Sequence, residues 1–178
     1  MRRWKSMLLC CFVLSCFVSI GLAETIVIDF DDYDGPLMPI PAGYAGFTSW
    51  GSFAYSSTAQ PPVYIPYSGT TYAISVGGEA PIVFGEAYVF LGAWFISYPG
   101  NGIAYELYAD GEVVYTSETM MLADEYQWQP SGYDGLVDEV KVLYAAGTNT
   151  WTMDDFTYET EMVAVEGTTW RALKDLYR

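Results

Sequence analysis

The chain has 178 residues, of which 22 are acidic and only 7 are basic, and its formal net charge is −15. A chain of this charge repels nucleic-acid phosphates and anionic membrane surfaces, and we therefore exclude both as partners. It contains no histidine, so any metal that it binds would be a hard cation held by oxygen ligands.

The first 23 residues have the features of a secretory signal peptide. Basic residues precede an apolar stretch from Met7 to Ile20, and small residues up to Ala23 offer a cleavage site, so we expect an exported protein that begins at Glu24. It would then lie in the periplasm, on the cell surface or outside the cell, with no membrane span in the mature chain. Two alternatives stay open, an uncleaved membrane anchor and a lipoprotein signal that places a lipid on Cys16.

Cleavage would remove all three cysteines and leave four basic against 22 acidic side chains, a net charge of −18. The mature protein could then form neither a disulfide nor a thiolate metal site. Its 155 residues are enough to bury a core, because a domain of roughly 150 residues hides about 70% of the surface of its unfolded chain.

Strands are expected along most of the mature chain. Segments that alternate apolar and polar residues are separated by Gly, Pro, Asn and Asp clusters, which is typical of antiparallel sheets. Prolines concentrate between Asp31 and Pro66, where we expect ordered loops and short edge strands. Three segments place apolar residues on one strand face: Ile26, Ile28 and Phe30; Tyr72, Ile74 and Val76; and Ile103, Tyr105 and Leu107.

The middle of the chain predicts a central strand followed by a hairpin. Ala87–Tyr98 is apolar on both faces, which indicates a strand covered on both sides and bent at Gly92. Residues Ile103–Ala109 and Glu112–Ser117 flank Asp110-Gly111, a pair that tolerates the positive φ angles of a type I′ turn.

The remaining elements are two late strands, Val137–Tyr144 and Thr150–Glu159, and a short amphipathic helix that Thr168 or Thr169 would cap. The sequence therefore predicts an all-β, antiparallel β-sandwich domain at 24–161. Residues 162–178 would form a linker and a short C-terminal helix.

Two acidic clusters are candidates for a metal site. Asp29 and Asp31 lie near the start of the domain, and Asp154 and Asp155 lie in its last strand. The first and last strands of a sandwich can be neighbours, which would bring these carboxylates together. Calcium is a suitable partner because the domain has almost no basic side chains. The alternative, that these aspartates are solvated or cap backbone groups, stays open.

The last strand also contains a change of face. Trp151 and Met153 share one parity, whereas Phe156 and Tyr158 share the other. Either both faces are covered or a bulge at Asp154-Asp155 switches the apolar face. Without a bulge, Asp154 would share a face with Phe156 and would need a cation or several hydrogen-bond donors.

Several short motifs occur in a recognisable order: Phe30-Asp31-Asp32, Pro41 to Phe47 with Trp50 and Phe53, Ala87 to Phe90, the Asp110-Gly111 hairpin, and Met153 to Tyr158. Over residues 25–159 this order resembles a group of uncharacterised exported bacterial domains, many with PEP-CTERM sorting tails. The resemblance implies a jelly-roll β-sandwich like those of carbohydrate-binding, galactose-binding-like domains. In calcium-bearing sandwiches of this kind, the positions that match Asp29, Asp31, Asp154 and Asp155 often hold a structural ion. Residues 168–178 depart from the sorting pattern because they contain no closing membrane span.

Aromatic residues are the candidates for ligand binding, since an exposed Trp or Tyr face can stack on a sugar ring. The chain has 16 tyrosines, and large aromatic side chains also commonly fill cores, so both roles stay open. The candidates in loop-like or edge segments are Trp50, Tyr64, Tyr126 and Trp128, with Tyr55 and Tyr67 as further members.

No catalytic signature is present. The mature chain lacks His and Cys, the commonest general base and the thiol nucleophile, and no glutamate pair is spaced for a glycosidase. The sequence therefore predicts a non-catalytic extracytoplasmic module that binds carbohydrate or a surface polymer, with structural calcium. The alternative is a structural or assembly module of the cell surface with its C-terminal tail as a docking or sorting element.

The calcium hypothesis predicts that millimolar calcium raises the melting temperature and that a chelator lowers it. Asp154→Asn should remove this response. A melting temperature that does not depend on calcium would contradict the hypothesis.

Overall fold

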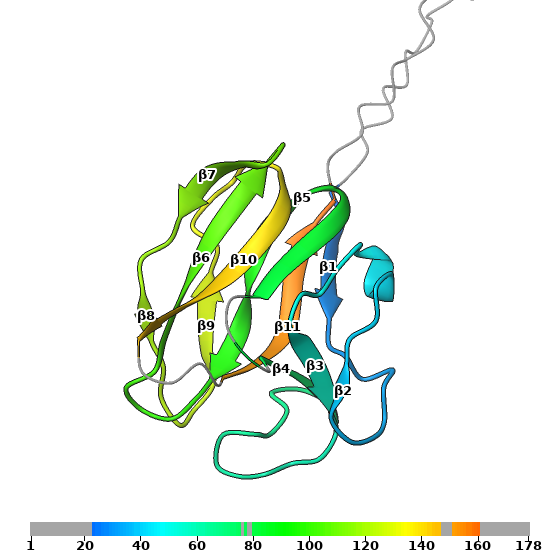
Figure 1. Cartoon of the computed structure of the whole chain (residues 1–178), viewed down its shortest axis with the longest axis vertical. Coiled ribbons are helices and arrows are strands. Elements are labelled where there is room, and N and C mark those ends of the chain that lie inside the picture. The colour runs from blue at the N-terminus through cyan, green and yellow to red at the C-terminus, as the bar shows by residue number, and fades with distance from the viewer. Residues whose placement is uncertain (1–22, 76, 78–79, 147–150, 161–178) are drawn as a thin grey trace, which may run out of the picture. The chain divides into compact units, whose positions relative to one another are not determined.

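The computed structural model describes residues 23–75, 77, 80–146 and 151–160 (Figure 1). Residues 1–22 of the predicted signal peptide and the predicted linker and helix at 162–178 lie outside these residues. Within the described ranges the structure is antiparallel β-sheet with one short 3-10 helix, η1 (Tyr44–Gly46), which confirms the prediction of an all-β fold. No helix in this part of the chain is long and apolar enough to cross a membrane.

Two antiparallel layers share the 17-residue strand β5. One layer has the order β2-β3-β4-β11-β5-β9, with β1 also on β11, and the other has the order β5-β10-β6-β7, with β8 also on β6. The strands are β1 (Thr25–Ile28), β2 (Met38–Pro39), β3 (Phe53–Ser56), β4 (Tyr72–Ser75), β5 (Ala80–Ile96), β6 (Gly102–Ala109), β7 (Glu112–Thr116), β8 (Met120–Met121), β9 (Gln127–Pro130), β10 (Val137–Ala146) and β11 (Thr152–Glu159).

The hairpin and the central strand follow the sequence prediction. Asp110 and Gly111 have φ angles of 53° and 78°, and they join β6 to β7. Strand β5 is longer than predicted because its first half pairs with β10 and its second half with β11 and β9. The register between β5 and β11 shifts on both sides of the Gly92–Thr157 pair, where the sequence indicates a bend.

The core between the layers is largely aromatic. The Phe47 ring packs on Trp50 at 5.1 Å between centroids, and Phe90 packs on Phe156 at 4.7 Å and on Tyr105 at 5.0 Å. All five side chains are buried. Fully burying large apolar side chains contributes roughly 1.5–3 kcal/mol each, so this cluster is a main source of stability.

The first and last strands are neighbours, as the sequence predicts. Strand β1 pairs with β11 in an antiparallel register in which Ile28 lies opposite Phe156. One extra residue interrupts the pairing of β11 with β5 between Asp154 and Thr157, and Asp155 has a φ of 48°. This bulge lets both Met153 and Phe156 face the core, and the alternative without a bulge is wrong.

The apolar face predicted for β4 is not the face that meets the core between the layers. Ala73, and not Tyr72, belongs to the core cluster. Tyr72 is nevertheless 2% exposed, because it lies beneath a loop and its hydroxyl donates to the carbonyl of Thr58 (2.9 Å). Apolar alternation fails to identify the core face of a strand when the opposite face is also covered. Val76 lies outside the described residues.

Gly92 supplies the first test. Its φ of 145° is unfavourable for other residues, and a Cβ at this position would collide with the carbonyl oxygen of Gln129. We expect Gly92→Ala to lower the unfolding free energy by about 2–4 kcal/mol in urea titrations. Gly100, with a φ of 95° and open space around it, is the control, and Gly100→Ala should cost only about 1 kcal/mol. Equal losses would contradict a steric role for Gly92.

Candidate functional site

Residues 57–71, here called the covering loop, connect β3 to β4 and contact the outer face of the β9–β5–β11 layer. The Thr152 hydroxyl of β11 donates to the carbonyl of Val63 (3.2 Å). The Tyr126 hydroxyl, just before β9, donates to the carbonyl of Ile65 (2.6 Å). Thr152 and Val63 are 0% and 1% exposed, so the loop buries part of a sheet face that would otherwise meet water.

Asp154 fixes the centre of the covering loop. Its Oδ2 accepts the backbone N–H groups of Tyr67 (2.8 Å) and Ser68 (3.1 Å), and its Oδ1 accepts the N–H of Asp155 (2.8 Å). The side chain is 0% exposed. Three amide donors thus supply the partners that a buried carboxylate requires.

Asp31 fixes the end of the same loop. Its Oδ1 accepts the backbone N–H groups of Thr70 (2.7 Å) and Thr71 (2.9 Å). Gly69 has a φ of 53°, and a Cβ there would collide with the Asp31 carboxylate. Glycine is therefore required where the backbone bends closely around this aspartate.

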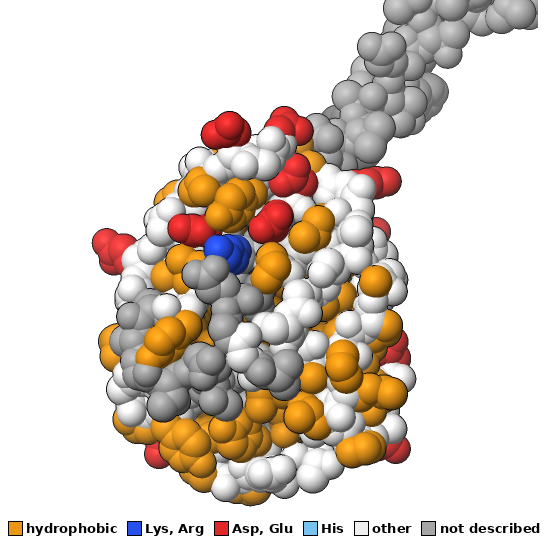
Figure 2. Space-filling view, viewed as in Figure 1, with side chains coloured by type: hydrophobic (Ala, Val, Ile, Leu, Met, Phe, Trp, Pro, Cys, Tyr) orange, Lys and Arg blue, Asp and Glu red, His pale blue; other side chains and the backbone are white. Residues whose placement is uncertain are grey.

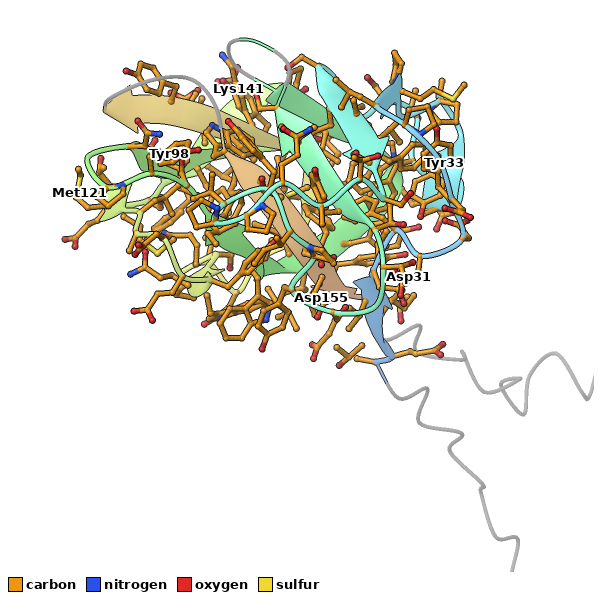
Figure 3. All side chains as sticks on the ribbon, turned by 90° about the horizontal axis from the view of Figure 1, so that it is seen from below. Asp31, Tyr33, Tyr98, Met121, Lys141 and Asp155 are labelled. Atoms are coloured by element: carbon orange, nitrogen blue, oxygen red, sulfur yellow. The ribbon has the colours of Figure 1, made fainter. Side chains whose placement is uncertain are left out.

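Each of the four predicted metal ligands accepts hydrogen bonds in the structure, and those of Asp154 and Asp31 are described above. Asp155 accepts the Ser68 hydroxyl (2.7 Å), and Asp29 accepts the N–H of Asp31 (3.1 Å). Figure 3 shows Asp31 and Asp155 close together at one end of the described unit. Among the residues that the structure describes, no group of three or more acidic side chains is arranged to hold a metal ion. The site thus has hydrogen-bond donors as its visible partners, and calcium stays a prediction.

Burial dominates the protonation of this acidic pair. It raises the pKa of Asp154 to about 7, although the N–H donors of Ser68, Asp155 and Tyr67 act in the opposite direction. Burial also raises the pKa of Asp155, and the neighbouring carboxylates of Asp29 and Asp31 add to that increase. Both groups therefore hold their protons more strongly in the folded state than in the unfolded chain.

Four rings form what we call the aromatic patch: Tyr67, Trp94, Tyr126 and Trp128. Tyr67 stacks on Trp94 with centroids 4.2 Å apart and contacts Tyr126 edge-on at 5.3 Å. Trp94 and Trp128 lie opposite each other on β5 and β9, 5.7 Å apart. Tyr67 is 43% exposed and the other three are partly exposed. The structure thus joins Tyr126 and Trp128, both predicted, to Trp94, which the sequence places only in a central strand.

The other two aromatic candidates lie elsewhere. The expectation that Trp50 is exposed is wrong, because Trp50 is 1% exposed in the core and its Nε1–H donates to the carbonyl of Tyr44 (3.1 Å). Tyr55 is also buried. Tyr64 is partly exposed and meets Tyr98 edge-on at 6.3 Å, outside the aromatic patch.

Negative charge dominates the surface. Lys141 is the only basic residue in the described part of the chain, and Figure 2 shows acidic side chains gathered around the basic group on the face that it displays. A pocket of about 460 Å³ between β5 and the β6–β7 turn is lined by Glu86, Asp110, Asp138 and Glu139 among others. These charges disfavour anionic ligands.

No protein-family profile and no curated protein sequence matches the chain. Solved structures similar to it include a variant of the family 29 carbohydrate-binding module CBM29-2 complexed with cellulohexaose, with a TM-score of 0.49 and 17% identity over 78% of this chain and 92% of that chain. A second family 29 module has a TM-score of 0.46 and 15% identity over 78% and 90% of the two chains. TmCBM61 in complex with beta-1,4-galactotriose has a TM-score of 0.42 and 12% identity over 68% and 94%.

The raised pKa of Asp154 predicts a pH dependence of stability. The folded state binds a proton below about pH 7 that the unfolded chain releases near 3.8, so this group's contribution is complete below pH 3.8 and is lost as the pH rises through 7. We expect the unfolding free energy to fall by about 2 kcal/mol between about pH 5 and pH 8. Urea titrations at these pH values would measure it.

Asp154→Asn cannot titrate and should show a smaller decrease over the same pH interval. An Asp154→Asn protein with the pH dependence of the natural protein would contradict this assignment.

Proposed function

We propose that this protein is a non-catalytic extracytoplasmic module that binds carbohydrate, such as a surface polysaccharide, on the aromatic patch. The observation that carries the proposal is the exposed Tyr67 ring, stacked on Trp94 and flanked by Trp128 on the outer face of the sheet. Sugar rings present C–H groups on their faces, and these pack against exposed aromatic rings. Clustered aromatic side chains at a surface commonly mark a binding site.

Hydrogen-bonding groups lie beside these rings. Ser68 follows Tyr67 directly, and its hydroxyl donates to the partly exposed Asp155 (2.7 Å). A carboxylate and a hydroxyl next to aromatic rings can accept from and donate to the hydroxyl groups of a sugar. The patch therefore offers both kinds of contact that a neutral polysaccharide makes.

The rings are also held in place before any ligand arrives. The backbone of Tyr67 is fixed by Asp154 (2.8 Å), and the Tyr126 hydroxyl is fixed by the carbonyl of Ile65 (2.6 Å). Binding to a preformed surface loses less conformational entropy than binding that orders a loop. This arrangement supports a binding role for the patch.

Trp128→Ala and Tyr67→Ala test the proposal. Each should weaken retention on the bound polysaccharide at least about tenfold, as truncation of central aromatic residues does at other interfaces. A glycan array and pull-down on insoluble polysaccharides would first identify the ligand and then measure the loss.

Tyr144→Ala is the matched control, because Tyr144 is a 37% exposed tyrosine of β10, in the other layer. It should bind like the natural protein, and melting curves should show all three variants folded. A glycan array without any signal, together with retention on cells, would contradict the proposal and favour an assembly module of the cell surface.

A further inference from the structure

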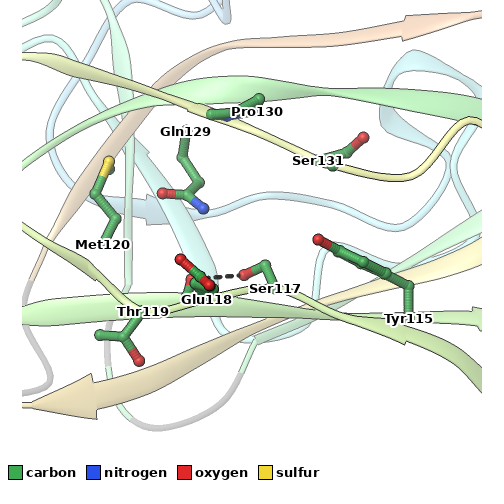
Figure 4. Close-up of a pocket in the computed structure, with 9 residues that line it drawn as sticks. Tyr115, Ser117, Glu118, Thr119, Met120, Gln129, Pro130 and Ser131 are labelled. Carbon is green, nitrogen blue, oxygen red and sulfur yellow. Dashed lines mark hydrogen bonds between the residues drawn. The ribbon is translucent and has the colours of Figure 1, made fainter.

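A pocket of about 410 Å³ lies at one open edge between the two layers (Figure 4). One wall is β9, which pairs with β5, and the other is the segment from β7 to β8, whose strands pair with β6. The aromatic patch uses Trp128 of β9, whereas this pocket uses the next residue, Gln129. Successive residues of a strand point to opposite faces, so the two sites lie on opposite sides of β9.

Gln129 is the feature that marks the pocket. Its side chain is 7% exposed and extends from β9 toward the segment that carries Ser117 and Glu118 (Figure 4). Its backbone carbonyl accepts the Tyr105 hydroxyl (3.2 Å). Its carboxamide, however, makes no hydrogen bond to any residue that the structure describes. In the described part of the chain the fully enclosed polar side-chain atoms without a partner belong to Ser52, Ser75, Gln127 and Trp151. The Gln129 amide is therefore open to the pocket that it lines, where a ligand can bond to it.

Some polar groups of the pocket wall form hydrogen bonds within the protein, and others can bond to a ligand. Ser117 Oγ donates to the carbonyl of Glu118 (3.0 Å) and accepts the N–H of Tyr105 (2.8 Å), so it is satisfied internally. The exposed Glu118 carboxylate lines the same pocket, as does Tyr115. Gln129 thus offers a donor and an acceptor, Glu118 an acceptor, and the Tyr115 hydroxyl both.

Tyr115 packs against the residues that follow β9. Tyr115 stacks on Tyr133 with centroids 5.8 Å apart. Gly132, with a φ of 75°, leaves room for the Tyr115 hydroxyl, because a Cβ there would lie 2.5 Å from that oxygen. The ring is therefore held at the pocket by its neighbours on both sides.

We infer that this pocket binds one residue of a neutral sugar, as a second site that shares no residue with the aromatic patch. Its volume lies in the usual range for small-molecule sites, about 300–1,000 Å³. The amide, carboxylate and phenol match vicinal hydroxyl groups, which both donate and accept hydrogen bonds. An anionic group would meet Glu118 and the net negative charge of the chain, which excludes uronic acids and phosphates as favoured ligands.

NMR titration with D-glucose, D-galactose, D-mannose and D-xylose tests the inference. A sugar that binds should shift the Gln129 side-chain amide signals and leave the indole N–H signals of Trp94 and Trp128 unchanged. Gln129→Leu should weaken that sugar's binding about tenfold or more, because the hydrogen bonds of both amide atoms are lost. Replacing an amide that bonds to no other side chain or backbone group with an apolar group of similar size should not unfold the protein.

Gln127→Leu is the matched control, since Gln127 lies on the same strand and its Oε1 is buried without a partner, but it does not line the pocket. It should leave the sugar affinity unchanged. The inference is overturned if none of the four sugars shifts the Gln129 amide, or if Gln129→Leu binds as tightly as the natural protein.

The two sites can fail separately. Trp128→Ala tests the aromatic patch through polysaccharide retention, and it should leave the monosaccharide shifts at Gln129 in place. Loss of those shifts in folded Trp128→Ala would show that the sugars bind at the aromatic patch. The inference about the pocket would then be wrong, whereas the proposed function of the patch would stand.

Discussion

The bulge in β11 is the constraint on which both the core and the outer face depend. Strand side chains alternate strictly, so a shift of one residue exchanges the two faces of everything that follows. The extra residue at Asp154-Asp155 lets Met153 and Phe156 both face the core. Without it, half of this central strand would present its largest apolar side chains to the outside. The two carboxylates at the bulge, Asp154 and Asp155, accept hydrogen bonds from Tyr67 and Ser68 of the covering loop.

The covering loop gives the outer face a second layer of packing. Beneath it Tyr72, Thr152 and Asp154 are almost fully buried, although none of them belongs to the core between the sheets. The loop covers only part of this face. The Tyr67 ring stacks on Trp94, which stays partly exposed. Structural anchoring and ligand binding therefore use the same segment, since the Tyr67 N–H bonds to Asp154 and the Tyr67 ring stacks on Trp94.

Local patterns predicted much of this fold. The Asp110-Gly111 hairpin and the central strand follow from turn chemistry and alternation, which are properties of adjacent residues. Alternation also indicated the position of the bulge, but it left open whether both faces of the strand are covered instead. The pairing of the first and last strands agrees with the sandwich architecture that the sequence predicts, in which these two strands can be neighbours. The core face of β4 could not, because it depends on a loop whose return to the sheet the local pattern does not encode.

The candidate site could be predicted only in part, because its contacts join residues that are far apart in the sequence. The sequence indicates that a buried Asp154 needs a cation or several donors, but the donors are amides 86 and 87 residues earlier in the chain. Trp50 lies in a segment that the sequence predicts as loop, and its burial depends on the long-range contact with Phe156 of β11. The unpaired amide of Gln129 has no sequence signal at all, since its meaning comes from the opposite wall of the pocket.

The covering loop is held mainly through its backbone, so its side chains can vary. Asp31 and Asp154 bind the backbone N–H groups of Thr70, Thr71, Tyr67 and Ser68. Side-chain hydroxyls add to this support only at Ser68 and Thr70, and the Tyr67 side chain adds nothing to it. Every residue except proline carries the same N–H group. Substitutions at the position of Tyr67 can therefore change the chemistry displayed on the surface without removing the bonds that hold it. Substitutions in such a loop can change which ligand is bound while the backbone hydrogen bonds to Asp31 and Asp154 stay the same.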